Sequence, residues 1–333
     1  MSVRALRELR RTLGSVLPSV AMAPVDAVPL EVSAPPSEPP RMRPCTVVEG
    51  ERLGVRSVVG APEVRFAAFL DGAQESHVLE YVDGAPIVWG RVAAVIRARV
   101  ERRLRTWGSG PLQGARLYVP RDLVPASVFA PIEASGIPVV NTLDDDGVKY
   151  GPGAPDFPHP HELLRRAVHR VQEDRDRLER QLAEEWCARE SEPLFVDGGV
   201  PTGERTMSAP GLVGVVKSHH TMYTTDDGRR HVLALPEGAR TSVFVVTRTW
   251  GPAVLSWYLR LRPFATHNPF AGLVRIEVAP LAEGGTAGSL TTRADQISRW
   301  VLAERYPLSL PDGRWDRMTY GVRDCEELLR AVR

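Results

Sequence analysis

Hydrophobic residues recur at helical spacing in four parts of the chain. The clearest is residues 160–190, where apolar positions form one stripe between charged side chains: Leu164, Val168, Val171, Leu178, Leu182 and Trp186. Such a stripe predicts a long amphipathic helix. Leucines at 6, 9, 13 and 17 predict a second amphipathic helix over residues 3–17. Two further helices are expected near the C-terminus, over residues 291–305 and 324–333.

Between the helical stretches lie short, largely apolar runs that are typical of strands. They cover residues 63–72, 76–82, 86–98, 115–120, 136–143, 192–199, 211–220, 240–248, 253–263 and 272–280. Asp83-Gly84 supplies the positive φ angles of a tight hairpin turn, so we expect three consecutive antiparallel strands at the start of the core. Strands mixed with helices predict an α/β fold.

A proline-rich stretch separates the first predicted helix from this core. Prolines between residues 18 and 44 remove backbone donors and favour extended chain. The sequence therefore predicts an N-terminal helix at 1–17, a proline-rich linker or arm at 18–50, and one α/β domain at 51–333.

Charge and composition limit the classes of function that the sequence can have. The 333 residues hold 42 basic and 41 acidic side chains, whereas proteins that bind nucleic acid unaided usually carry a basic excess. Any nucleic acid is therefore gripped locally or delivered by a partner. The three cysteines are far apart and form no CxxC pair, which fits a reducing cytoplasm, and no stretch is apolar for long enough to predict an export signal or a membrane span. Walker, dinucleotide and serine-nucleophile motifs are absent from the sequence.

Two apolar runs end in an aspartate followed by glycine. Asp71 and Asp197 would lie side by side if their strands are neighbours, and the glycine after each lets the chain turn away from the carboxylate. Hard cations such as Mg²⁺ and Mn²⁺ need carboxylates that converge from different elements. A single Asp-Gly pair is more simply a turn, as we expect at Asp83, but the two together favour a metal site.

The long helix offers a third carboxylate. At about 100° per residue, Glu179 falls on the flank of the apolar stripe, with Glu185 on the opposite flank as the second choice. Either glutamate alone would be read as part of a solvated helix face.

Basic residues near the strand ends are candidates for contacts with phosphate. Lys217 leaves a buried run and can neutralise charge on a scissile phosphate, or simply mark the end of the strand. One of the two adjacent histidines, His219, is a candidate to line the cleft. Arg260 and Arg262 alternate with apolar residues and are candidates to face a phosphate backbone. For Arg275 and Glu277, a structural ion pair is the favoured interpretation.

The order of these residues resembles the active-site plan of the ribonuclease H-like superfamily, and within it the sequence resembles the NurA family of DNA nucleases. The stretches that carry the resemblance are FLDG at 69–72, LERQL at 178–182, LFVDGG at 194–199, GVVKSH at 214–219, WYLRL at 257–261, VRIEV at 274–278 and RYPLSLP at 305–311.

The resemblance implies a ribonuclease H-like mixed sheet flanked by helices. It also implies that Asp71, Glu179 and Asp197 bind Mn²⁺ or Mg²⁺ and that Lys217 assists at the phosphate. The implied activity is metal-dependent 5′–3′ exonuclease or endonuclease cleavage of DNA ends in repair. The implied assembly is a cytoplasmic homodimer docked on a HerA-like hexameric ATPase.

The sequence departs from the family near its C-terminus. The family usually places an alanine-histidine pair after the Tyr-Pro element, whereas this chain has no histidine there. Asp316 is the first replacement candidate for the last metal ligand, and Asp312 and Asp295 are the alternatives. The missing histidine favours a second hypothesis, in which the chain is a weakly active or inactive scaffold or DNA-clamping subunit of an ATPase complex.

Overall fold

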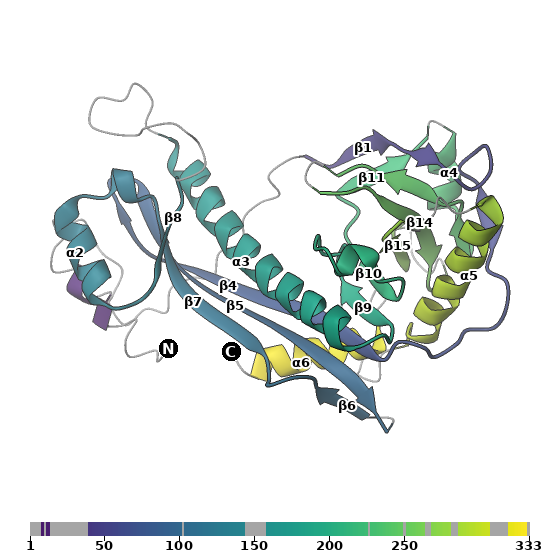
Figure 1. The fold of residues 1–333 in the computed structure, drawn as a ribbon. Helices are drawn as coiled ribbons and strands as arrows, with labels where there is room; N and C mark the ends of the chain where they lie inside the picture. Colours follow the sequence, from purple (N-terminus) through teal and green to yellow (C-terminus); the bar gives the residue numbers. More distant parts are fainter. Residues whose placement is uncertain are drawn as a thin grey trace. The chain divides into compact units, whose positions relative to one another are not determined.

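Long strands and one long helix organise the chain (Figure 1). The structure, a computed structural model, describes residues 8–9, 11–13, 39–101, 103–143, 158–225, 227–248, 251–263, 268–280, 286–306 and 319–331. The chain divides into two compact units. The first comprises residues 1–38, 73–93 and 112–178, and the second comprises residues 39–72, 94–111 and 179–333.

The first unit is a small sheet with helices. Its strand order is β4-β5-β7-β8, formed by parts of β4 (Ala68–Val82) and β5 (Ala85–Val100) together with β7 (Leu112–Val119) and β8 (Val139–Asn141). The 3₁₀ turn η1 (Arg121–Leu123) and helix α2 (Ala126–Ala134) connect β7 to β8. The predicted Asp83-Gly84 turn is confirmed, because both residues have positive φ, 49° and 85°.

Helix α3 (Pro160–Arg189) matches the predicted long helix, and its first part belongs to this unit. Its Ala167 and Val171 pack on Val88 and Val92 of β5. A Cβ at Gly90 would lie 2.5 Å from the Val171 side chain, so this close approach of helix to strand requires glycine.

The second unit has a mixed sheet with helices against it. Its order is β2 (Thr46–Val47), β13 (Phe244–Val246), β14 (Val254–Arg260), β15 (Leu273–Val278), β10 (Leu212–Val216), β9 (Leu194–Asp197) and β4. The β4-β9 and β9-β10 pairs are parallel, and β10-β15, β14-β15 and β13-β14 are antiparallel. β12 (Ala239–Thr241) pairs with β14 and β3 (Val55–Ser57), and β6 (Arg103–Thr106) pairs with β5.

Four shorter pieces and two longer helices complete the second unit. They are β1 (Arg41–Pro44) paired in parallel with β11 (Thr221–Thr224), the 3₁₀ turn η2 (Thr206–Ser208), α4 (Gly228–Leu233), α5 (Ala287–Ala303) and α6 (Tyr320–Ala331). The predicted fold class, a mixed α/β sheet flanked by helices, is confirmed. No helix in the described part of the chain has an apolar stretch long enough to cross a membrane.

Several boundaries differ from those expected. The strand that contains Asp71 does not end there, because β4 continues through Gly72 to Val82 as one strand. The run at 240–248 is two strands, β12 and β13, and α2 was not expected. Residues 41–44 and 46–47, which the sequence places in the proline-rich arm, form β1 and β2.

Candidate metal and active site

Two parallel strands bring the predicted aspartates together. The β4-β9 register pairs Phe69 with Phe195 and Leu70 with Val196, so the next step along both strands sets Asp71 beside Asp197. Paired residues of neighbouring strands lie side by side, which is why residues 126 positions apart meet although β4 itself continues to Val82. After Asp197 the chain turns at Gly198, whose φ is 129°.

Helix α6 adds a third carboxylate to these two. Single carboxylate oxygens of Asp71, Asp197 and Glu326 all lie within 4.8 Å of one another. Glu326 was not among the candidates from sequence, because the last ligand was sought at Asp316, Asp312 and Asp295. Asp316 and Asp312 lie outside the described residues.

Asp295 belongs to a different cluster, which excludes it from this one. Its Oδ1 accepts a hydrogen bond of 2.6 Å from Nε of the buried Arg240, whose other nitrogens bind Glu49. The alternative that Asp295 is the last ligand is therefore corrected: it is a partner in a buried ion network.

The position of Glu326 depends on how α6 docks. Gly321 lies directly against the ring of Phe69, where a Cβ would approach to 2.1 Å, and the Cys325 thiol donates to the Phe69 carbonyl at 3.4 Å. Asp324 pairs with Arg97 of β5. The first turns of α6 are thus fixed two residues away from Asp71 on β4, and this places Glu326 at the two aspartates.

Lys217 lies where the sequence predicts. In the β9-β10 register Val215 stands beside Asp197, and Lys217 projects from the same face two residues later. Its Nζ is 2.9 Å from Asp197 Oδ1. Lys217 thus pairs with Asp197, while Arg323 of α6 pairs with Glu326 at 3.2 Å.

The electrostatics of Asp71 reflect its burial and its charged neighbours. Asp71 is 8% exposed, and burial raises its pKa well above the usual value. The charge of Asp197 raises the pKa further, Lys217 opposes the shift, and Glu179 and Glu326 add to it. Glu179 is therefore close enough to act on Asp71, although it is not in the group within 4.8 Å. Glu185, the second choice, interacts with Gln181 on α3.

The loop after Asp197 is held by a buried ion network. Glu277 Oε2 accepts a hydrogen bond from the backbone N–H of Val200, while Arg248 donates to the Val200 carbonyl and to Glu277. Arg275 binds the other oxygen of Glu277, which confirms the structural ion pair predicted for these two residues. Burial alone would raise the pKa of Glu277, but the two guanidinium groups lower it overall.

The residues predicted to contact nucleic acid lie inside the protein. Arg260 is fully buried, and its guanidinium donates to the carbonyls of Leu233, Leu235, Pro269 and Ala271. Arg262 is 4% exposed and donates to the carbonyl of Arg305. Both arginines hold the protein's own backbone, so the prediction that they face a phosphate backbone is corrected.

His219 is also held by its neighbours. Its Nε2 lies 2.9 Å from the Leu273 carbonyl oxygen, and its ring stacks on Phe270 with centroids 5.2 Å apart. These contacts give it a packing role at the end of β10. Lys217 is thus the member of the predicted basic set that the structure brings to the carboxylates.

The donor set fits a hard divalent cation. Carboxylate oxygens are the ligands that Mg²⁺ and Mn²⁺ prefer, and three of them converge on one point. Like charges buried together are costly, and a divalent cation between them would offset that cost. Residues 71, 197 and 326 are therefore a suitable metal site.

Comparisons with known proteins identify similarity to solved structures. No protein-family model matches the chain, and neither does any curated protein. Among solved structures, the crystal structure of the NurA nuclease from Sulfolobus solfataricus is similar, with 8% sequence identity and a TM-score of 0.41 over 84% of this chain and 82% of that one. A similarity of this size carries no functional conclusion, so function is inferred below from the residues of the site.

Proposed function

We propose that this chain is a divalent-metal-dependent nuclease that hydrolyses phosphodiester bonds in DNA. The observation that carries the proposal is the convergence of Asp71, Asp197 and Glu326, with Lys217 bound to Asp197. A bound Mn²⁺ or Mg²⁺ would supply Lewis-acid stabilisation of the phosphate and activation of water. Asp71, Asp197 and Glu326 are the residues that would hold it.

Each side chain has a separate task in this proposal. Lys217 donates to a non-bridging phosphate oxygen and neutralises the charge that develops there, while its contact with Asp197 keeps it in place. Glu179 adds a fourth negative charge beside Asp71 and is a further candidate ligand. The Glu277 network fixes the backbone at Val200, three residues after Asp197, and so limits movement of that carboxylate.

Glu326 changes the balance between the two hypotheses from sequence. The absent family histidine favoured an inactive scaffold, but α6 delivers a carboxylate to the cluster from the C-terminal part of the chain. We therefore favour the enzyme. Action on DNA ends in repair, a homodimeric state and a HerA-like ATPase partner are parts of the same proposal, and the near-balanced charge of the chain fits delivery of DNA by such a partner.

Metal binding and cleavage test the proposal together. Wild-type protein is titrated with Mn²⁺ by calorimetry, then incubated with end-labelled single-stranded and duplex DNA in Mn²⁺, Mg²⁺ or EDTA. Asp71→Asn and Glu326→Gln should lose both Mn²⁺ binding and cleavage, and Lys217→Ala should keep binding but cleave about 10²–10³-fold more slowly.

Glu327→Gln is the matched control, because Glu327 is the next residue on α6 and, like Glu326, pairs with Arg323, but its carboxylate is not among the three within 4.8 Å of one another. This variant should bind Mn²⁺ and cleave like wild type. If wild-type protein binds no divalent cation and cleaves no DNA under any of these conditions, even with an ATPase partner added, the nuclease proposal fails and the scaffold remains.

A further inference from the structure

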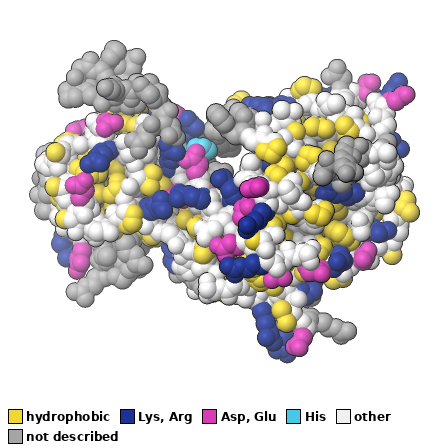
Figure 2. Space-filling model, in the orientation of Figure 1, with side chains coloured by type: hydrophobic (Ala, Val, Ile, Leu, Met, Phe, Trp, Pro, Cys, Tyr) yellow, Lys and Arg dark blue, Asp and Glu magenta, His cyan; other side chains and the backbone are white. Residues whose placement is uncertain are grey.

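The β5-β6 hairpin concentrates positive charge in a chain that is otherwise balanced. Residues 97–105 contain five arginines and one glutamate, whereas the whole sequence has 42 basic and 41 acidic side chains. Figure 2 shows Lys and Arg side chains gathered at this hairpin. Since Arg260 and Arg262 are buried, this is a candidate for a local grip on nucleic acid.

The strand register separates the arginines onto two faces. Arg97 lies opposite Thr106 and Arg99 opposite Leu104, so these four residues share one face. Arg97 binds Asp324 of α6 and the Thr106 hydroxyl. Arg99 binds both oxygens of Glu304 at 2.9 Å and the Phe66 carbonyl. The arginines of this inner face are therefore neutralised by the fold.

The outer face differs in both exposure and pairing. It consists of Arg103 opposite Val100 and Arg105 opposite Ala98. Both arginines are exposed, and neither forms an ion pair with any residue that the structure describes. Val100 beside them is also exposed. The guanidinium groups of Arg103 and Arg105 thus share one strand face, form no ion pair with a described acidic residue, and are available to an external anion.

An aromatic platform with another arginine follows directly after β6. The rings of Trp107 and Trp186 contact each other with centroids 5.3 Å apart and their planes tilted by 60°, and Trp107 Nε1 donates to Glu190 at 3.1 Å. The Arg189 guanidinium lies 5.6 Å from the centre of the Trp107 ring. Trp107 is half-buried, so part of its side chain is exposed beside the guanidinium of Arg189.

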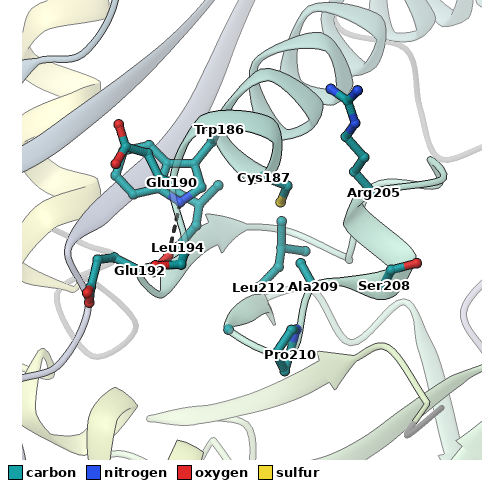
Figure 3. Close-up of a pocket in the computed structure, with 12 residues that line it drawn as sticks. Trp186, Cys187, Glu190, Glu192, Leu194, Arg205, Ser208, Ala209, Pro210 and Leu212 are labelled. Atoms are coloured by element: carbon teal, nitrogen blue, oxygen red, sulfur yellow. Dashed lines mark hydrogen bonds between the residues drawn. The ribbon is translucent and has the colours of Figure 1, made fainter.

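This platform borders a cavity of about 370 Å³ in the second unit (Figure 3). Trp186 and Glu190 line one side, and Arg205 and Ser208 come from the segment before β10. Leu194 and Leu212, the first residues of β9 and β10, form its floor. The cavity therefore lies at the beginning of β9, whereas Asp197 is at the end of that strand.

We propose that the outer face of the hairpin, Arg103 and Arg105, together with Arg189 and the Trp107 ring, binds the phosphate backbone of DNA away from the carboxylates. Guanidinium groups suit phosphate oxygens, and an aromatic ring beside them accepts an unstacked base. This proposal rests on the proposed function, because it takes DNA as the partner. It assigns local DNA binding to this surface in a chain whose basic and acidic residues are nearly equal in number.

Binding without cleavage separates the two proposals. Fluorescence anisotropy with labelled single-stranded and duplex oligonucleotides is measured in EDTA over a range of salt concentrations, using the full chain. Arg103→Gln/Arg105→Gln should weaken binding about tenfold and reduce the slope of log K against log salt by roughly two, because two phosphate contacts are lost.

Arg229→Gln/Arg230→Gln on α4 is the matched control, since it removes the same charge from two exposed arginines elsewhere in the second unit. It should leave affinity within about twofold of wild type. A loss confined to single strands assigns the site to unpaired DNA and implicates Trp107, while an equal loss on both DNAs assigns it to the phosphate backbone alone.

Equal weakening by both double variants, or none by the hairpin variant, overturns this inference. The nuclease proposal is judged by separate results, Mn²⁺ binding and loss of cleavage in Asp71→Asn. The hairpin variant should retain Mn²⁺ binding and show its defect mainly as a raised KM for DNA. A wild-type protein that binds DNA through the hairpin but never cleaves it would instead support the scaffold.

Discussion

Two clusters of acidic groups lie in the second unit, and they are balanced in opposite ways. Around Arg240, Glu49 and Asp295 surround one guanidinium, and all three residues are less than 9% exposed. Glu49 also accepts hydrogen bonds from the Val243 backbone N–H and the Thr291 hydroxyl. At the carboxylate cluster of Asp71, Asp197 and Glu326, Lys217 pairs with Asp197 and Arg323 pairs with Glu326, but burial and neighbouring carboxylates still raise the pKa of Asp71.

The pKa directions of the two clusters show what this difference means. Burial alone would raise the pKa of Glu49, but hydrogen bonds from Arg240 and Thr291 and the Arg240 charge lower it overall. Burial and neighbouring carboxylates raise the pKa of Asp71, and Lys217 only partly opposes them. The Arg240 cluster is complete in itself and stabilises the fold, whereas at the Asp71 cluster the nearby cations do not offset the burial of Asp71 and the charges of its neighbouring carboxylates. Such an imbalance is typical of a site that binds a cation.

Removing the central cation of the complete cluster should have the largest effect. Arg240→Leu leaves Glu49 and Asp295 buried without a partner, and the free energy of unfolding should fall by about 3–5 kcal/mol. Urea unfolding measures it. The triple variant Glu49→Met/Arg240→Leu/Asp295→Leu should recover most of the loss, because no uncompensated charge remains. A loss below about 1 kcal/mol in Arg240→Leu would show that the network contributes little.

The incomplete cluster should be sensitive to the docking of α6. Gly321→Ala places a methyl group against the Phe69 ring and should destabilise the protein by about 1–3 kcal/mol. It should also weaken Mn²⁺ binding, since Glu326 lies on the same helix, whereas Arg240→Leu at a permissive temperature should not. Calorimetric titration of both variants makes this distinction. Unchanged Mn²⁺ affinity in Gly321→Ala would mean that Glu326 is not needed at the cluster.

The parts of the site that were predictable from sequence depend on local patterns. Asp71, Asp197 and Lys217 each follow an apolar run, and the parallel arrangement of β4, β9 and β10 brings such positions together. The pattern overstated the role of Gly72, because β4 continues past Asp71. The approach of Glu179 to Asp71 followed from its place on the flank of the apolar stripe, although that place did not put it within the closest group.

The rest depends on contacts between residues distant in sequence. Glu326 is one of two glutamates on α6, and the docking of that helix through the contacts of Gly321 and Cys325 with Phe69 decides that it faces the aspartates. Arg260 alternates with apolar residues as an exposed arginine would, but every residue of β14 is buried. Arg240 is 191 residues from Glu49, so no local pattern shows their pairing.

Replacing the buried aspartate should raise stability while it removes function. Asp71→Asn keeps the shape of the side chain but removes a charge that burial and Asp197 disfavour, so in EDTA the free energy of unfolding at pH 7 should rise by about 1 kcal/mol. Saturating Mn²⁺ should stabilise the wild type and leave the variant unchanged. A variant that is less stable than wild type in EDTA would contradict the view that the negative charge of Asp71 is not offset by its neighbours.

The smallest expected effect is the pH dependence of the unfolding free energy, and it should have opposite signs for the two clusters. The raised pKa of Asp71 means that the folded protein holds this proton more tightly than the unfolded chain does. The unfolding free energy therefore falls as pH rises from about 3.9, the unfolded value, through the folded pKa. The lowered pKa of Glu49 has the opposite consequence. Its contribution is present above about 4.3 and is lost as pH falls through the folded pKa.

Urea unfolding in EDTA between pH 3 and pH 8 separates these signs. The gain from Asp71→Asn should shrink toward zero as pH falls, because wild-type Asp71 is then protonated and resembles the asparagine. Glu49→Gln should lower the unfolding free energy at pH 7. This loss should also shrink toward zero as pH falls, because protonated Glu49 no longer forms an ion pair with Arg240. The two difference curves should thus have opposite signs at pH 7 and converge in acid. Curves of the same sign at pH 7 would mean that both clusters are balanced alike, and the distinction between a stabilising network and a cation site would be lost.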